Sequence, residues 1–152
     1  MNVPFVDLRA QYATLKPEMD AAINAIIANT AFIGGKAVSD FESAFAEYVG
    51  SPHCVSVANG TEAIEIALRA FGIGEGDEVI VPANSFIATS EAVTSAGAQV
   101  VFADSEPNYY SIDIDDVRRK ITDRTRAIIP VHLYGHPADM NAVLATAREH
   151  TL

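Results

Sequence analysis

Apolar residues recur along the first third of the chain at the spacing of amphipathic helices. This pattern predicts a first helix over Pro17–Asn29 and a second over Ala37–Val49, separated by a loop that contains Gly34 and Gly35. The second helix stops at Gly50, a residue suited to cap a helix C-terminus. It is expected to bury three apolar side chains on one side, Phe41, Phe45 and Val49.

Beyond residue 50, short runs rich in Val and Ile alternate with helical stretches. The predicted strands are Cys54–Val57, Glu78–Val81, Gln99–Ala103 and Ala127–Val131. The predicted helices are Glu62–Phe71, Ser85–Ala96, Ile114–Ile121 and a last one from Ala138 to the end. Strands separated by helices predict β-α-β crossovers, so the fold class is α/β, with a mostly parallel sheet covered by helices on both faces. We therefore expect an N-terminal helical segment, residues 1–50, and the first part of an α/β domain, residues 51–152.

The last predicted helix ends at the point where an α/β pattern would enter its next strand. We therefore expect an incomplete sheet and a chain that is part of a longer protein.

Composition narrows the class of partners. The chain has 152 residues, 49% of them apolar, which favours a folded domain over disorder. Its formal net charge of -10 disfavours binding to nucleic acid or to anionic membranes. Cys54 is the only cysteine, so an intramolecular disulfide is excluded and a reducing compartment is expected. The chain has no apolar run of membrane-spanning length, and it carries charged residues near its start. The sequence therefore predicts a cytoplasmic location.

The turn Asn59-Gly60-Thr61 joins a predicted strand to a predicted helix and is the first candidate for chemistry. The N-terminus of a helix leaves backbone N–H groups unpaired and carries partial positive charge, which suits an anion. Gly60 lets a phosphate approach the backbone, and the Thr61 hydroxyl offers one more donor. The alternative is that Asn59 or Thr61 only caps the helix, because these residue types are common caps.

Phe86 lies in the loop that follows the second predicted strand. Ligands in open α/β sheets bind at the carboxyl edge of the strands, and this loop shares that edge with Gly60 and Thr61. The ring of Phe86 could stack on a flat cofactor, whereas the alternative is a phenylalanine of the hydrophobic core.

Three other patterns are interpreted structurally. The glycines of Gly72-Ile73-Gly74-Glu75-Gly76 follow a helix and precede a strand, the wrong context for a dinucleotide fingerprint, so a helix end and a turn are predicted. His132 and His136 have Gly135 between them and Pro137 after them, which disfavours a helical metal site, and no metal is expected. A capped, solvated helix start is predicted for the acidic run Asp113, Asp115 and Asp116.

Several motifs follow one another over nearly the whole chain: Phe5-Val6-Asp7-Leu8, Phe32-Ile33-Gly34-Gly35, Ala58-Asn59-Gly60-Thr61-Glu62-Ala63, Gly76-Asp77-Glu78-Val79-Ile80-Val81-Pro82, Ser85-Phe86-Ile87-Ala88-Thr89 and Pro130-Val131-His132-Leu133-Tyr134-Gly135. Taken together, these segments give the chain a resemblance to the DegT/DnrJ/EryC1/StrS family of nucleotide-sugar aminotransferases. The order and spacing of these segments are more specific for the family than any single segment is.

The resemblance implies an aspartate-aminotransferase-like fold, type I among enzymes dependent on pyridoxal 5'-phosphate, of which residues 51–152 form the first part of the large domain. It implies that Gly60 and Thr61 bind the cofactor phosphate, that Phe86 stacks on the pyridine ring, and that His132 is a candidate neighbour. It also implies a homodimer that transfers an amino group, from glutamate as the expected donor, to a keto group of a nucleotide-linked sugar.

The resemblance also implies a Schiff-base lysine, and none of Lys16, Lys36 and Lys120 has its sequence context. All three are predicted to be solvated surface lysines, and the chain alone is predicted to be inactive. Two alternatives stay open: a sugar dehydratase of the same family, in which a histidine replaces the lysine, and a non-catalytic piece that depends on a partner. A nicotinamide-dependent oxidoreductase is a distant third, because the glycines at 72, 74 and 76 are misplaced for it.

Overall fold

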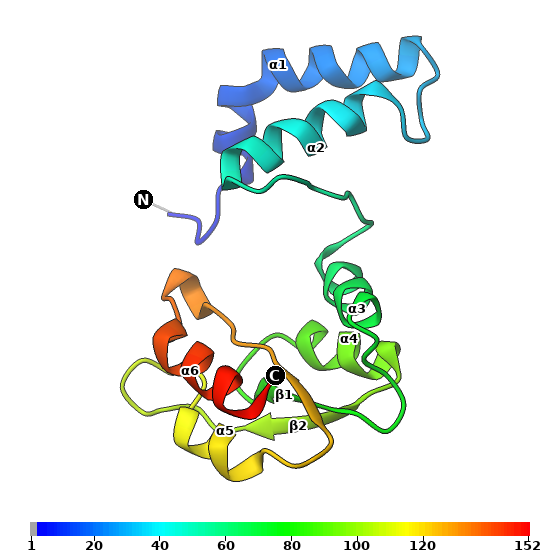
Figure 1. The fold of residues 1–152 in the computed structure, drawn as a ribbon. Helices are drawn as coiled ribbons and strands as arrows, with labels where there is room; N and C mark the ends of the chain where they lie inside the picture. Colours follow the sequence, from blue (N-terminus) through cyan, green and yellow to red (C-terminus); the bar gives the residue numbers. More distant parts are fainter. Residues whose placement is uncertain (1–2) are drawn as a thin grey trace. The chain divides into compact units, whose positions relative to one another are not determined.

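The computed structural model describes residues 3–152 and divides the chain into two compact units, Met1–Ser56 and Val57–Leu152 (Figure 1). Over the described residues 3–56, the first unit contains only helices and their connections, whereas the second unit contains a parallel sheet with helices. None of the helices in residues 3–152 combines the length and the apolar content that a membrane crossing requires.

The first unit consists of helix α1, Leu8–Ala28, and helix α2, Lys36–Val49. Helix α1 begins well before the predicted start at Pro17, because the Asp7 carboxylate accepts a hydrogen bond from the N–H of Ala10 at 3.0 Å and caps the helix. Pro17 therefore lies inside the helix, where it cannot donate a backbone hydrogen bond. Helix α2 ends as predicted at Gly50, whose φ of 70° lies in the left-handed region.

The apolar side of helix α2 is formed but stays uncovered within the first unit. Phe41, Phe45 and Val49 are 56%, 44% and 52% exposed, so the expectation that they are buried is wrong for this unit. Phe41 and Phe45 stack on each other, with ring centroids 5.6 Å apart. The physical reason is that helix α1 does not cover this side of α2: Ala46 is the one buried residue of α2, and α1 has none.

Three parallel strands form the sheet of the second unit: β1, Glu78–Pro82; β2, Gln99–Ala103; and β3, Thr125–Ile128. Their order is β2-β1-β3, so β1 is central, and all five of its residues are buried. The predicted strand Cys54–Val57 is absent, since this segment pairs with none of the three strands and a strand without a partner forms no ladder. Strand β3 ends before the predicted limit at Val131 because Pro130 has no N–H to donate to a ladder.

Helices cover both faces of this sheet, which confirms the α/β prediction. Helices α3, Gly60–Ala70, and α4, Ala88–Ala96, contribute Leu68, Val93 and Ala96 to one hydrophobic core with Val79 and Val81 of β1. Helices α5, Ile114–Lys120, and α6, Met140–His150, contribute Val117 and Val143 to a second core with Ile80 of β1. Val79 and Val81 alternate with Ile80 along the strand, so the two cores lie on opposite faces of the sheet. A short 3-10 turn, η1, spans Leu133–Gly135.

Asp116 is an exception among the acidic residues that the sequence predicted to be solvated. Asp113 does cap helix α5, by accepting hydrogen bonds from the N–H groups of Asp115 and Asp116. Asp116 itself is only 7% exposed, and its carboxylate accepts from Lys120 at 2.6 Å and from the N–H of Asp104 at 2.7 Å. Lys120 also donates to the carbonyl oxygen of Phe102 at 2.7 Å, so it is not a freely solvated lysine. Helix α5 is thereby tied to the end of β2.

Candidate functional site

The N-terminus of helix α3 leaves two backbone donors available. Asn59 is the cap, and its side-chain oxygen accepts from the N–H of Glu62 at 3.0 Å. The Glu62 carboxylate reaches back and accepts from the N–H of Ala58 at 2.7 Å. Within residues 3–152, no hydrogen bond uses the N–H of Gly60 or of Thr61. The capping interpretation of Asn59 is therefore correct, and it leaves two N–H groups at the positive end of the helix for an anion.

The space beside these two donors is open. Gly60 is exposed, and a Cβ built on it would have no heavy atom within 4 Å. Thr61 is half-buried and lines a hollow together with Ile87 and Ser90. An anion can therefore approach the backbone at Gly60 with the Thr61 residue beside it.

Helices α3 and α4 pack side by side on one face of the sheet. Thr61 at the start of α3 lines a hollow with residues along α4, from Ser90 to Ser95, and Arg69 near the end of α3 donates to the carbonyl oxygen of Ser95. Helix α4 follows the carboxyl end of β1 after a short loop. The start of α4 therefore lies where ligands of α/β sheets bind, and Thr61 lines a hollow with Ile87 and Ser90 at that end of α4.

Phe86 lies in that short loop and presents its ring to the surroundings. Its carbonyl oxygen accepts from the N–H of Thr89 at 3.0 Å, which begins the first turn of α4. The loop is held by the N–H of Ala83, which donates to the carbonyl oxygen of Ala103 at 2.8 Å, and by the Ser85 hydroxyl, which donates to the carbonyl oxygen of Pro82 at 3.2 Å. The Phe86 side chain is 76% exposed, so the second unit does not use it as a core residue. One face of a flat ligand could stack on it.

His132 and His136 have separate local contacts. The Nδ1 atom of His132 accepts a hydrogen bond from the N–H of Ala138 at 3.1 Å. The ring of His136 stacks on Tyr109, with centroids 5.1 Å apart and an angle of 13° between the planes.

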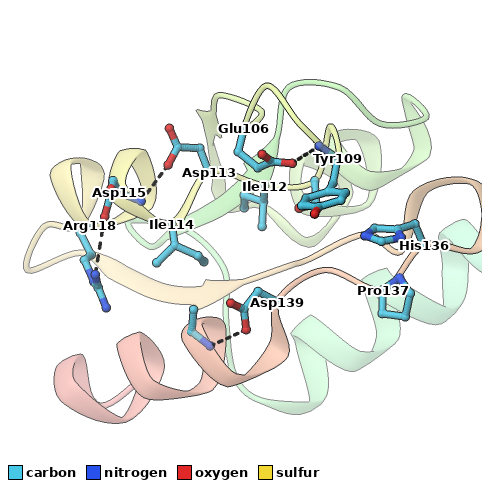
Figure 2. Close-up of a pocket in the computed structure, with 12 residues that line it drawn as sticks. Glu106, Tyr109, Ile112, Asp113, Ile114, Asp115, Arg118, His136, Pro137 and Asp139 are labelled. Atoms are coloured by element: carbon cyan, nitrogen blue, oxygen red, sulfur yellow. Dashed lines mark hydrogen bonds and ion pairs between the residues drawn. The ribbon is translucent and has the colours of Figure 1, made fainter.

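A hollow of about 450 Å³ lies beside the stacked pair and is lined by several carboxylates (Figure 2). These carboxylates already have partners in the structure. Asp139 caps α6 through the N–H of Ala142, Asp115 pairs with Arg118 at 3.6 Å, and Glu106 accepts from the N–H of Asn108 at 2.8 Å. We therefore place the candidate site at the α3 turn and not in this hollow.

None of the three lysines is an unpaired amine. Lys16 donates to Asp20 and to Tyr12, and the hydrogen bond to Asp20 raises the pKa of Lys16 above its ordinary value. Lys36 pairs with Asp40 at 2.6 Å, and Lys120 with Asp116. A lysine that forms an imine must be deprotonated, so the raised pKa of Lys16 disfavours that chemistry.

The glycine run after helix α3 forms a helix end and a turn, as predicted. Gly72 has a φ of 74°, and the Asp77 carboxylate accepts from the N–H of Gly74 at 3.0 Å. The turn leads into β1, so it does not form the strand-to-helix loop that binds a dinucleotide.

The hydrogen bond that the Glu62 carboxylate accepts from the N–H of Ala58 was not predicted from the sequence. Its signal was present, because Asn59 followed three residues later by Glu62 is the spacing of a capping box.

The sequence profile of the DegT/DnrJ/EryC1/StrS aminotransferase family matches residues 13–152. The dTDP-3-amino-3,4,6-trideoxy-alpha-D-glucose transaminase of Streptomyces venezuelae is 45% identical over 99% of the chain. The UDP-N-acetyl-3-dehydro-alpha-D-glucosamine 3-aminotransferase of Acidithiobacillus ferrooxidans is 47% identical, also over 99%. The chain spans only 40% and 41% of the length of these two relatives.

Solved structures show the same similarity. The crystal structure of DesV from S. venezuelae, in complex with a ketimine intermediate, has a TM-score of 0.95 and 45% identity over 99% of this chain and 40% of its own. The structure of NtdA from Bacillus subtilis, with bound cofactor PMP, has a TM-score of 0.93 and 33% identity over 99% of this chain and 35% of its own.

Proposed function

Because the chain belongs to the DegT/DnrJ/EryC1/StrS aminotransferase family, we propose that it binds pyridoxal 5'-phosphate through the turn at Gly60 and Thr61 and the ring of Phe86. Pyridoxal phosphate is the cofactor of this family. The observation that carries the proposal is the pair of N–H groups left unpaired at the start of α3, at the same sheet edge as an exposed aromatic ring.

The described residues fit the two ends of the cofactor. The N–H groups of Gly60 and Thr61 bind the phosphate, and the positive end of the helix dipole lowers the energy of its charge. The Thr61 hydroxyl adds a donor, and Phe86 stacks on the ring and fixes its plane. When bound, the pyridoxal ring supplies the electron sink for amino transfer.

The overall reaction that we propose for the whole protein is transfer of an amino group, from glutamate or another amino acid, to a keto group of a nucleotide-linked sugar. The names of the sugar aminotransferases that the chain resembles support this reaction. A homodimer and a cytoplasmic location belong to the same proposal. The chain supplies the phosphate and ring contacts of the site.

The 152-residue chain by itself is expected to be inactive, because each of its lysines lies in an ion pair. Purified chain, pyridoxal phosphate, glutamate and a nucleotide-linked keto sugar are expected to give no amino sugar above a blank without protein. Sustained turnover would overturn this expectation.

Substitution at Gly60 tests the phosphate site directly. Gly60→Pro removes one of the two N–H donors, yet proline suits the first position of a helix, and Asn59 already has the extended conformation that a following proline requires. We expect Gly60→Pro to weaken binding of pyridoxal phosphate by about tenfold without loss of helix content, measured by cofactor absorbance and circular dichroism.

Gly60→Ala is the matched control, because it keeps the N–H and places its methyl group in open space. If Gly60→Pro and Gly60→Ala bind pyridoxal phosphate with equal affinity, the N–H of Gly60 does not bind the phosphate.

A non-catalytic piece that depends on a partner is the second candidate. It is favoured by the apolar side chains that the second unit leaves exposed, such as Phe71 at 83% and Leu144 at 44%. A cooperatively folding monomer in size-exclusion chromatography would count against it.

A further inference from the structure

Strand β2 lies at one edge of the sheet, so one side of its backbone has no neighbouring strand within the described residues of the second unit. The N–H of Gln99 donates to the carbonyl oxygen of Asp77 at 2.8 Å, so Gln99 and the residues two and four positions onward face β1. Because the backbone groups of successive residues in a strand point to opposite sides, those of Val100 and Phe102 face the open edge. Such outward donors and acceptors are a template for another strand.

The residues of β2 carry none of the usual protections of an edge strand. Proteins commonly place charged side chains or proline on such strands. The strand has the sequence Gln-Val-Val-Phe-Ala, without a charge or a proline, and a short uncharged segment that favours strands is prone to pair with copies of itself. Protection of this edge must therefore come from another element.

Helix α5, which lies beside β2, supplies two side chains that bind the open edge (Figure 1). The ammonium group of Lys120 donates to the carbonyl oxygen of Phe102 at 2.7 Å. The Asp116 carboxylate accepts from the N–H of Asp104, the residue directly after the strand, at 2.7 Å. Lys120 and Asp116 also pair with each other at 2.6 Å, and Asp116 is buried, so the two side chains are held against the edge.

The chain beyond β2 folds back over the same edge. The N–H of Asp113 donates to the carbonyl oxygen of Asp104 at 2.8 Å, and Ser105 forms an antiparallel bridge with Ile112. An approaching strand would need the outward groups of Phe102 and Asp104, yet the carbonyl oxygen of Phe102 and both backbone groups of Asp104 are already in use. The free edge is thereby shortened to the first residues of β2.

We propose that Lys120 and Asp116 form an edge guard, a pair of side chains that prevents β2 from pairing with β2 of a second copy of the chain. A second copy is the partner because two β2 strands, antiparallel about a two-fold axis, offer each other the same N–H and C=O groups. The strand is uncharged, so two copies of it bring no like charges together. This role of α5 goes beyond the proposed function and does not depend on cofactor binding.

Two substitutions on α5 that differ in one contact test the edge guard in the full chain. Lys120→Met keeps an apolar stem but loses the donor to the carbonyl oxygen of Phe102. Arg119→Met also removes a cation that pairs with Asp116, at 3.0 Å, but no hydrogen bond joins Arg119 to β2 within residues 3–152. We expect Lys120→Met to self-associate about tenfold more tightly than Arg119→Met in sedimentation equilibrium, because it frees an acceptor on the edge.

A change in β2 itself shows whether the added association uses this edge. Phe102→Pro removes the outward N–H of residue 102 and leaves the hydrogen bonds to β1, since proline is tolerated on edge strands. Combined with Lys120→Met, it is expected to return the association constant to that of Arg119→Met. Phe102→Lys keeps the backbone N–H and places a charge on a side chain that is 50% exposed. It is expected to give the same result and replaces the proline variant if that variant does not fold.

The outcomes decide between the edge guard and a purely structural role of Lys120. Equal association of Lys120→Met and Arg119→Met would overturn the edge guard. Tighter association of Lys120→Met that persists when Phe102 is changed would also overturn it, because the contact would then lie elsewhere. Tighter association that disappears with the change at Phe102 supports it.

Discussion

At the scale of single residues, the Asp116 carboxylate ties helix α5 to the end of β2. This carboxylate accepts hydrogen bonds from Lys120, from the N–H of Asp104 and from Arg119. Asp116→Asn keeps an acceptor for Asp104 but removes the charge that both cations bind, so we expect the free energy of unfolding to fall by about 1–3 kcal/mol in urea titrations. Asp115→Asn, on an exposed residue of the same helix, is expected to change it little.

The same carboxylate predicts a pH dependence. The hydrogen bond from Lys120, followed by that from Asp104, lowers the pKa of Asp116 from 3.8 to about 2. Because the pKa is lower in the folded state, the stabilisation is complete above pH 3.8 and is lost as the pH falls toward 2. The difference in stability between the original chain and Asp116→Asn should therefore shrink over this interval, and a difference independent of pH would contradict the assignment.

The sequence predicted the turn that begins helix α3 and the loop that follows β1, but not what each side chain contacts. The turn at Gly60 and Thr61 was located because the change from strand-like to helical periodicity marks it, and Phe86 because it follows a strand. The roles of these residues in cofactor binding remain predictions. The burial of Asp116 could not be foreseen, since its partners at Phe102 and Asp104 meet it only in the folded chain.

At the scale of elements, strand β2 matches its prediction in both limits, Gln99–Ala103, because the strand-favouring residues Val100, Val101 and Phe102 stand between Gly97 and Asp104. The segment Cys54–Val57 has the same kind of composition but no ladder, since its pairing depends on residues far away in the sequence. The first helix was misplaced because a proline was taken as a helix start. An acidic cap at Asp7 was the stronger signal.

Helix α1 offers a test of this last point. Pro17→Ala restores a backbone N–H to the helix interior and removes a ring that crowds the preceding turn, so we expect it to stabilise the helix by about 1–3 kcal/mol and to raise the ellipticity at 222 nm. Glu18→Ala, which exchanges one good helix former for another at the next position, is the control. A loss of ellipticity in Pro17→Ala would mean that the proline is needed where it stands.

At the scale of the whole molecule, the uncovered apolar surface favours self-association, whereas the net negative charge opposes it. Phe71 and Leu144 line an apolar hollow of about 450 Å³ with Ile128 of β3, the strand at one edge of the sheet. We expect the purified chain to self-associate, and Leu144→Lys to shift sedimentation toward the monomer, whereas Thr94→Lys on the exposed side of α4 should not. Because the net charge of -10 is repulsive, added salt should strengthen association. Monomeric behaviour at all salt concentrations would contradict this.

The central position of β1 has a consequence for the route by which the second unit folds. Pairing with β2 joins Glu78 to Gln99, 21 residues onward, whereas pairing with β3 joins it to Thr125, 47 residues onward. Closing the longer loop costs about 0.7 kcal/mol more entropy, so the β1 and β2 pair, with helix α4 across it, should form the folding nucleus, and β3 should dock afterwards. The loop that carries Phe86 would then form early, whereas the segment that follows β3 would take its place only when β3 docks.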